Sequence, residues 1–159
     1  MAHHSSQVSA DLLWEITRNQ NAFLVKRAGA GGLRFSRDPL NLVNIHSRKN
    51  AGFVNDKAVG VLPLAGEKGG VTLITKKAKH PQRPAHQGHK TNLSGSKSSR
   101  KISKTVAANV AKTGYRPDLR AHAVSRASAI LKSQKTPKDL PESKPRGAKA
   151  KKAAAEKEE

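Results

Sequence analysis

The sequence predicts an α+β fold, in which a small antiparallel sheet with an N-terminal helix is followed by an extended basic segment and two basic amphipathic helices. Two runs rich in Val, Leu and Ile flank a glycine-containing loop within residues 58–77, which is typical of a β-hairpin. Four of the five aromatic residues lie in the first 75 residues, whereas positive charge concentrates after them. Apolar residues then recur at helical spacing across residues 101–135.

The elements expected in residues 9–78 form one small domain. Ser9 can cap a short helix that carries Leu12, Leu13 and Ile16 on its apolar positions. The stretch AFLVKR predicts a strand, and a second extended piece follows the glycines of GAGG. With the hairpin of AVGVLPL and VTLITKK, this gives three or four antiparallel strands. Because a domain of about 70 residues buries a modest core, we expect it to be marginally stable alone.

The next segment, residues 79–100, is expected to be an extended, basic, RNA-binding stretch. Its single large apolar residue is Leu93, too little to build a packed core. Residues 1–8 are a short N-terminal extension, and residues 136–159 a Lys/Ala-rich tail. We expect the tail to be disordered, with at most a transient helix at its end, because short helices without a packing face are marginal.

Two helices are expected in residues 101–135. In the first, which runs to about residue 112, Ile102, Val106 and Val110 share one stripe. Ser98 or Ser99 can cap its start, and Gly114 suits its end.

The second helix lies in YRPDLRAHAVSRASAILKSQK. Pro117 and Asp118 favour its first turn, and its apolar stripe begins at Leu119. Its polar face is cationic and includes Arg126, while Arg120 falls within the apolar arc and should lie along an edge with its head exposed. An ordinary solvated face is the alternative, but surface helices usually mix both signs of charge.

Charge points to the class of partner. The 159 residues carry 31 Lys+Arg against 11 Asp+Glu, a formal net charge of +20, and residues 76–135 hold fifteen of the bases with one acid. Such self-repulsion is usually tolerated because a polyanion neutralises it. Nucleic acid is the leading candidate and an anionic membrane surface the second. No stretch approaches the roughly 20 apolar residues of a spanning helix, so we expect no insertion into a membrane.

The sequence offers little for catalysis. It has no cysteine, so neither a disulfide nor a cysteine zinc site is expected, and GAGG lacks the spacing of a phosphate-binding loop. The only histidine cluster, His80, His86 and His89, lies in a basic loop without acids, which disfavours a metal site. We therefore expect no enzyme, no cofactor and no small-molecule substrate.

The distribution of charge favours RNA over DNA. Readers of duplex DNA place a few side chains on one recognition helix, whereas here the charge extends over about 60 residues of extended and helical structure. RNA is recognised largely through its shape and backbone, which suits such a segment. The few aromatic residues disfavour base stacking as the main mode of binding.

Four stretches together resemble the eukaryote-type L-twenty-eight family of large-subunit ribosomal proteins: SADLLWEITRNQNAFLVKR, FSRDPLNLVNIHSRKNAGFVN, KAVGV and YRPDLRAHAVSRASAILKSQK. The resemblance covers about residues 9–135, in the family's order. It implies a structural component of the cytoplasmic large ribosomal subunit, bound to ribosomal RNA beside neighbouring ribosomal proteins and assembled in the nucleolus. It implies no catalytic residues.

The resemblance assigns to RNA the matching bases of SRK and of the second helix, and the charge pattern adds the other basic residues of the middle segment. The candidate RNA-binding residues are Arg48, Lys49, Lys76, Lys77, Arg83, Lys90, Lys97, Arg100, Lys101, Lys104, Lys112, Arg116, Arg120, Arg126, Lys132 and Lys135.

Three other functions are compatible with parts of the sequence. A nucleolar ribosome-assembly factor could use a similar N-terminal domain, although such factors usually carry long acidic tracts or further domains. A chromatin protein would fit the lysine and alanine character of AKAKKAAAEK, but not the strand-rich first part. A module for an acidic protein or a membrane would fit a basic amphipathic helix, yet it would leave the extended basic segment unexplained.

Overall fold

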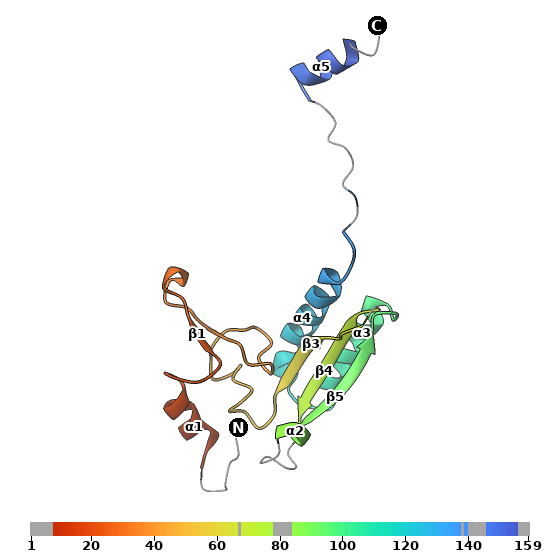
Figure 1. Ribbon diagram of the computed structural model, residues 1–159. Coiled ribbons are helices and arrows are strands. Elements are labelled where there is room, and N and C mark those ends of the chain that lie inside the picture. The colour runs from red at the N-terminus through yellow and green to blue at the C-terminus, as the bar shows by residue number, and fades with distance from the viewer. Residues whose placement is uncertain (1–7, 67, 78–83, 138, 140–145, 156–159) are drawn as a thin grey trace.

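The computed structural model describes residues 8–66, 68–77, 84–137, 139 and 146–155. Its body is a three-stranded antiparallel sheet with two helices against one face, and a second part, with α1 and a two-stranded ribbon, lies beside it (Figure 1). This arrangement confirms the predicted α+β class.

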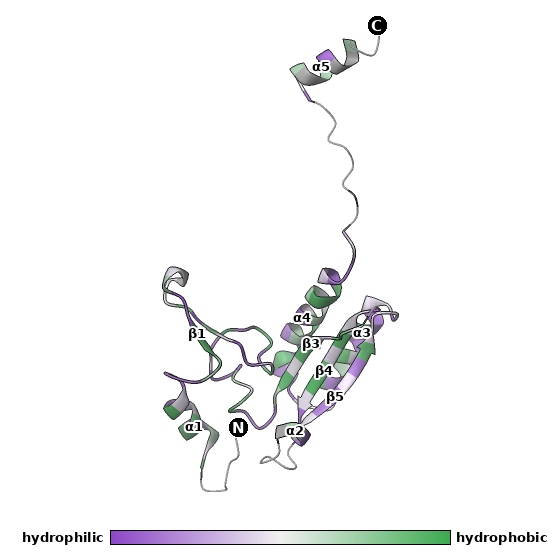
Figure 2. Ribbon diagram, in the orientation of Figure 1, coloured by the Kyte–Doolittle hydropathy of each residue, from purple (hydrophilic) through white to green (hydrophobic). Residues whose placement is uncertain are grey.

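The predicted hairpin forms the first two strands of the sheet. Strand β3 (Val59–Pro63) pairs with β4 (Gly70–Lys76), and β4 pairs with β5 (Gly88–Ser94) on its other side. The turn between β3 and β4 needs glycine, because Gly66, Gly69 and Gly70 all have positive φ. Hydrophobic residues dominate β3 and β4, while β5 carries hydrophilic stretches (Figure 2).

The two predicted helices follow β5. Helix α3 (Ser99–Ala107) begins at Ser98, whose hydroxyl accepts a hydrogen bond from the Lys101 amide, and continues as a π-helical turn, η2 (Ala108–Lys112). A 3-10 turn, η3 (Pro117–Leu119), leads into α4 (Arg120–Ser133). Gly114, with φ of 64°, turns the chain between them.

One core joins the sheet to both helices. Its members alternate along the strands and recur at helical spacing in α3 and α4. They are Leu42, Val59, Val61, Val71, Leu73, Leu93, Ile102, Val106, Val110, Leu119, Ala123, Ala127 and Leu131. The alanines of α4 in this core have no exposed surface, which lets that helix lie close to its neighbours. The core therefore crosses the boundary that the sequence suggested at residue 78.

The expectation of an extended segment without packing is wrong for residues 88–94. These residues form β5, which pairs with β4 over seven positions from Gly70↔Ser94 to Lys76↔Gly88. Leu93 is 4% exposed, opposite Val71. Backbone pairing with a neighbouring strand orders β5, so one buried apolar side chain is enough and composition alone could not reveal it. Helix α2 (Pro84–Gln87) precedes β5, and residues 78–83 lie outside the described part.

The N-terminal part contains α1 (Ala10–Thr17) and the antiparallel pair β1 (Leu24–Lys26) and β2 (Arg34–Ser36), separated by a 3-10 turn, η1 (Ala28–Ala30). The Ser9 cap is confirmed, since its hydroxyl accepts from the Leu12 amide. Trp14 stacks on His46, which lies beyond β2 in the chain. Near the C-terminus, the end of the expected tail forms helix α5 (Ala148–Ala155).

The loop after β2 packs on the sheet face opposite the helices. The carboxylate of Asp38, 3% exposed, accepts hydrogen bonds from the amides of Leu40 and Phe53. Gly60 of β3 lies against this loop, and a Cβ there would come within 2.5 Å of the Pro39 carbonyl oxygen. The contact is between two backbones, so a side chain at residue 60 cannot be accommodated by a change of rotamer.

We therefore expect Gly60→Ala to lower the free energy of unfolding by about 1–3 kcal/mol, the usual cost of overpacking. Urea unfolding of the full chain measures it. Gly29→Ala is the matched control, because a Cβ at residue 29 meets nothing within 4 Å. Equal stabilities for the two variants would contradict this close packing of β3 against the loop.

Candidate nucleic-acid interface

The candidate RNA-binding residues divide into three groups in the structure. Arg83 lies outside the described residues. Four are engaged with the protein itself: Arg48, Lys76, Arg116 and Arg126. The remaining eleven are exposed, and within the described part their side chains make no hydrogen bond or ion pair. These are Lys49, Lys77, Lys90, Lys97, Arg100, Lys101, Lys104, Lys112, Arg120, Lys132 and Lys135.

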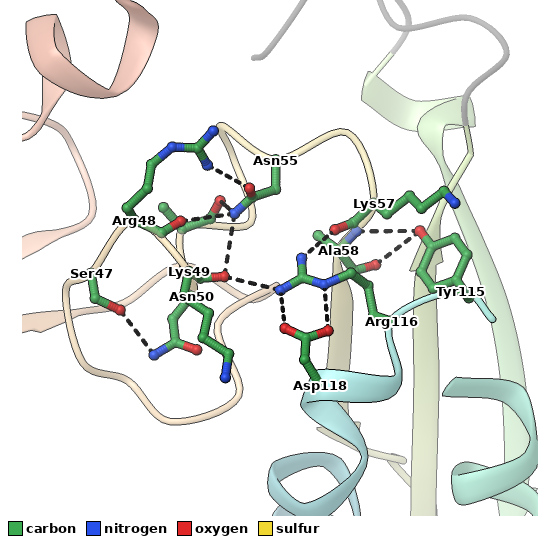
Figure 3. Close-up of polar contacts among 11 residues, drawn as sticks. Ser47, Arg48, Lys49, Asn50, Asn55, Lys57, Ala58, Tyr115, Arg116 and Asp118 are labelled. Atoms are coloured by element: carbon green, nitrogen blue, oxygen red, sulfur yellow. Dashed lines mark hydrogen bonds and ion pairs between the residues drawn. The ribbon is translucent and has the colours of Figure 1, made fainter. Parts of the chain in front are cut away.

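Arg116 fastens the start of the second helix to the loop before β3 (Figure 3). Its guanidinium donates to the carbonyl oxygens of Lys57 and Lys49, at 2.7 and 3.2 Å, and makes a two-point contact with Asp118, at 2.8 Å for each bond. Its side chain is 16% exposed. The planar fork of arginine suits this set of acceptors, and a lysine could not reproduce it. Arg116 is thus a structural residue in the folded chain.

Tyr115, the preceding residue, joins the same loop to the sheet. Its hydroxyl accepts from the amide of Ala58 at 3.2 Å (Figure 3). It also donates to the carbonyl of Lys76 at 2.6 Å. Burial raises the pKa of this phenol. We call Tyr115, Arg116 and Asp118 the clasp, because they bind the loop before β3, the end of β4 and the turn before α4 together.

Arg126 makes a second link, from the middle of α4. Its Nε donates to the carbonyl of Val61 in β3 at 2.9 Å. Its Nη1 donates to the carbonyl of Leu42 at 3.0 Å and to the side-chain oxygen of Asn44 at 2.9 Å. Desolvation by burial lowers the pKa of Arg126. The guanidinium holds α4 against the edge strand β3 and the loop after β2.

Lys76 and Arg48 also bind groups of the protein itself. The Lys76 ammonium, in a residue 6% exposed, donates to the carbonyls of Asn55 and Gly52 at 2.8 and 3.3 Å. Desolvation lowers the pKa of Lys76, against the opposing field of Asp56 and Asp38. Arg48 connects Asp11 of α1 to the side chain of Asn55. A count of charges along the sequence could not distinguish Lys76 and Arg48 from exposed bases. Their hydrogen-bond acceptors are backbone carbonyls or lie far away in the sequence.

Most of the exposed candidate bases lie on the body. Nine of the eleven lie within residues 84–137, on β5, on the turn before α3, and along α3, η2 and α4. The one acid in this range is Asp118, whose charge is bound to Arg116. That ion pair holds the pKa of Asp118 below its usual value. The surface of the helical pair therefore has a positive field without a carboxylate to offset it.

Other chemistries find little support in the described part of the chain. It contains no group of three or more His, Cys, Asp or Glu that could hold a metal ion, and His80 lies outside it. No described helix has the length and apolar character needed to cross a membrane.

Comparison with known proteins identifies close relatives. The model of the ribosomal L28e protein family matches residues 12–133. The large ribosomal subunit protein eL28 of Schizosaccharomyces pombe is 46% identical over 134 residues, which cover 84% of this chain and 98% of that protein. The protein of the same name from Caenorhabditis elegans is 35% identical, over 80% of this chain and 91% of its own length. That from Dictyostelium discoideum is 32% identical, over 82% and 92%.

The structural role of Arg126 can be tested against Arg120, a neighbour on the same helix. Arg126→Met should lower the free energy of unfolding by about 1.5–3 kcal/mol, because it leaves carbonyls of β3 and the loop without their charged donor. Arg120→Met should change it by less than about 0.5 kcal/mol, since Arg120 is exposed. Urea unfolding of the free full chain compares them; equal losses would refute the assignment.

The clasp also predicts a dependence of stability on pH. The pKa of Asp118 is lower in the folded state than in the unfolded state. Its contribution to the free energy of unfolding is therefore fully present above the unfolded-state pKa of about 3.9, and it is lost as the pH falls through the folded-state pKa. Asp118→Asn should be less stable than the parent at neutral pH, and the gap should narrow below about pH 4. Urea midpoints measured between pH 7 and pH 2 would show this; a gap that does not change with pH would contradict it.

Proposed function

The chain belongs to the ribosomal L28e protein family, and from this premise we propose that it is a structural constituent of the large ribosomal subunit that binds and stabilises folded ribosomal RNA. The relatives that carry the name large ribosomal subunit protein match it over most of their length. The observation that supports the binding of RNA is a set of exposed lysines and arginines on the body. Unlike those of Arg116 and Arg126, their side chains make no hydrogen bond or ion pair within the described part of the chain.

These bases require a polyanion as their partner. The nine exposed lysines and arginines within residues 84–137 have no counterion among the described residues. Phosphates would neutralise them, and the release of counterions from the nucleic acid would supply the affinity. Because the helices and β5 belong to one packed core, the charges are presented on a preformed surface. Folded RNA, with phosphates fixed in space, suits such a surface.

The protein recognises the RNA backbone rather than stacked bases. Base stacking requires free aromatic faces. Here Trp14 stacks on His46, Phe23 contacts Phe53, and the Tyr115 ring lies beneath the Lys57 ammonium with its hydroxyl bonded to the backbone. Phe35, the remaining aromatic residue, is half-buried in β2.

The proposal also states where the protein acts. It acts in the cytoplasmic ribosome beside other ribosomal proteins after assembly in the nucleolus, and it performs no catalysis. A nucleolar assembly factor that leaves before the subunit matures is the alternative. Stable presence in mature subunits separates the two.

A charge-reversal experiment tests the proposal. The variant Lys101→Glu, Lys104→Glu and Arg120→Glu removes exposed bases without touching the clasp or Arg126, and its recovery in large subunits on sucrose gradients should fall by about tenfold, since several phosphate contacts are lost. The control reverses the same number of exposed bases on the N-terminal part, Lys26, Arg27 and Arg37. Equal recovery of the two variants would contradict a role for the helical surface.

Sedimentation of the unaltered chain provides the second readout. We expect it to migrate with mature large subunits and polysomes and to remain there at high salt, because contacts enclosed within a particle are screened less than exposed ones. Confinement to nuclear precursor particles would favour the assembly factor.

A further inference from the structure

Three lysines from separate segments surround one concavity at an end of the body. Lys68 belongs to the turn between β3 and β4, Lys97 to the turn between β5 and α3, and Lys135 to the chain just after α4. The three segments lie at the same end of the sheet (Figure 1). The space between them has a volume of about 520 Å³. We call it the lysine concavity.

Backbone contacts fix the two turns against each other. The amide of Gly95 donates to the carbonyl of Gly69 at 3.0 Å. A Cβ on Gly95 would lie 2.1 Å from the carbonyl oxygen of Lys68, so only glycine allows the turns to come this close. This approach brings the turn that carries Lys68 next to the turn that carries Lys97.

Gln134 fixes the third segment. Its side-chain oxygen accepts from the amide of Gly70 at 2.8 Å, and its side-chain nitrogen donates to the carbonyl of the same residue at 2.9 Å. This two-point bond ties the end of α4 to the start of β4. Lys135 is the next residue, so the fold sets its position relative to the other two lysines.

The lining indicates the chemistry of the ligand. Lys68, Lys97 and Lys135 are exposed, and their ammonium groups have no partner among the described residues. No carboxylate is among the described residues that line the concavity; beside the lysines they include three serines, Ser96, Ser98 and Ser99. Ammonium and hydroxyl groups are donors for phosphate oxygens. Like charges around one concavity repel one another, and an anion bound between them would relieve that repulsion.

The same lining is poorly suited to reading bases by stacking. Among the described residues that form it there is no aromatic ring for stacking. Its one side-chain amide, Gln134, is held in place by Gly70 through both its oxygen and its nitrogen. Lysine and serine contact phosphate and sugar whatever the base, so this lining favours recognition of the backbone over recognition of sequence.

We propose that the lysine concavity binds backbone phosphates of ribosomal RNA independently of base sequence. This inference rests on the proposed function and adds the location and the chemistry of one contact. It includes Lys68, which the sequence did not single out because it is one base in a hairpin loop, far along the chain from Lys97 and Lys135. The glycines around it were the signal of a close approach.

The first test places a photoreactive side chain in the site. Ser96, which lines the concavity and is exposed, is replaced by benzoylphenylalanine in the full chain, and large subunits are purified from cells before irradiation. A crosslink to ribosomal RNA supports the proposal. A crosslink only to protein, or none, while the chain is present in the subunits, overturns it. If neither the substituted chain nor the unsubstituted chain is found in the subunits, the proposed function is refuted instead.

The second test measures how much the charges of the lysine concavity contribute to RNA binding. Binding of the full chain to RNA extracted from large ribosomal subunits is followed as a function of salt. Lys97→Met with Lys135→Met should reduce the slope of log affinity against log salt by about 1.4–1.8, since each lost phosphate contact is worth about 0.7–0.9. Lys97→Arg with Lys135→Arg should keep the parent slope. Both variants retain Gln134, and urea unfolding confirms that they are folded. An unchanged slope in the methionine variant would overturn the proposal.

Discussion

The fold depends on side-chain donors that reach backbone carbonyls where the sheet meets its loops and helices. Strand β3 is an edge strand, so carbonyls on its open side and in the loop before it have no partner in the sheet. Buried carbonyls without a donor are costly. Tyr115, Arg116 and Arg126 supply the donors from the second helix.

The basic residues of the chain therefore have two different functions. Arg116 and Arg126 use their charge on the protein, with Asp118 or carbonyl groups as acceptors. The exposed lysines and arginines of α3 and α4 have no such acceptors among the described residues, so their charge is available to a partner. A net charge of +20 therefore overstates the interface, although most of the exposed candidate bases lie on the body. Reversal of Arg116 or Arg126 would affect folding before it affected binding.

Local patterns predicted the local structure well. The apolar stripe from Ile102 to Val110, the Ser98 cap and the Gly114 turn all follow from spacing and residue type, and the structure confirms them. The hairpin of β3 and β4 was equally clear. Strand β5 was missed because its order comes from pairing with β4, and a hydrophilic edge strand has no strong pattern of its own.

Sequence reasoning was less reliable for the arginines. Arg120 is exposed, in agreement with the expected exposure of its head, but Arg126, which the helical wheel placed on the polar face, is half-buried. A wheel gives the direction of a side chain but not what lies beside the helix. The acceptors of Arg126, in β3 and the loop after β2, lie 65 or more residues away in the chain. Only the tertiary arrangement brings them within reach.

Hydrogen exchange of the free full-length chain tests the central claim, that the body folds without RNA and presents its charges on a finished surface. Amides of β5 that pair with β4 should exchange far more slowly than those of Thr136 and Asp139, because they belong to the same core as α3 and α4. If β5 exchanged as fast as those residues without RNA, the sheet would be incomplete in the free protein. The interface would then form only on binding, which would contradict a preformed surface.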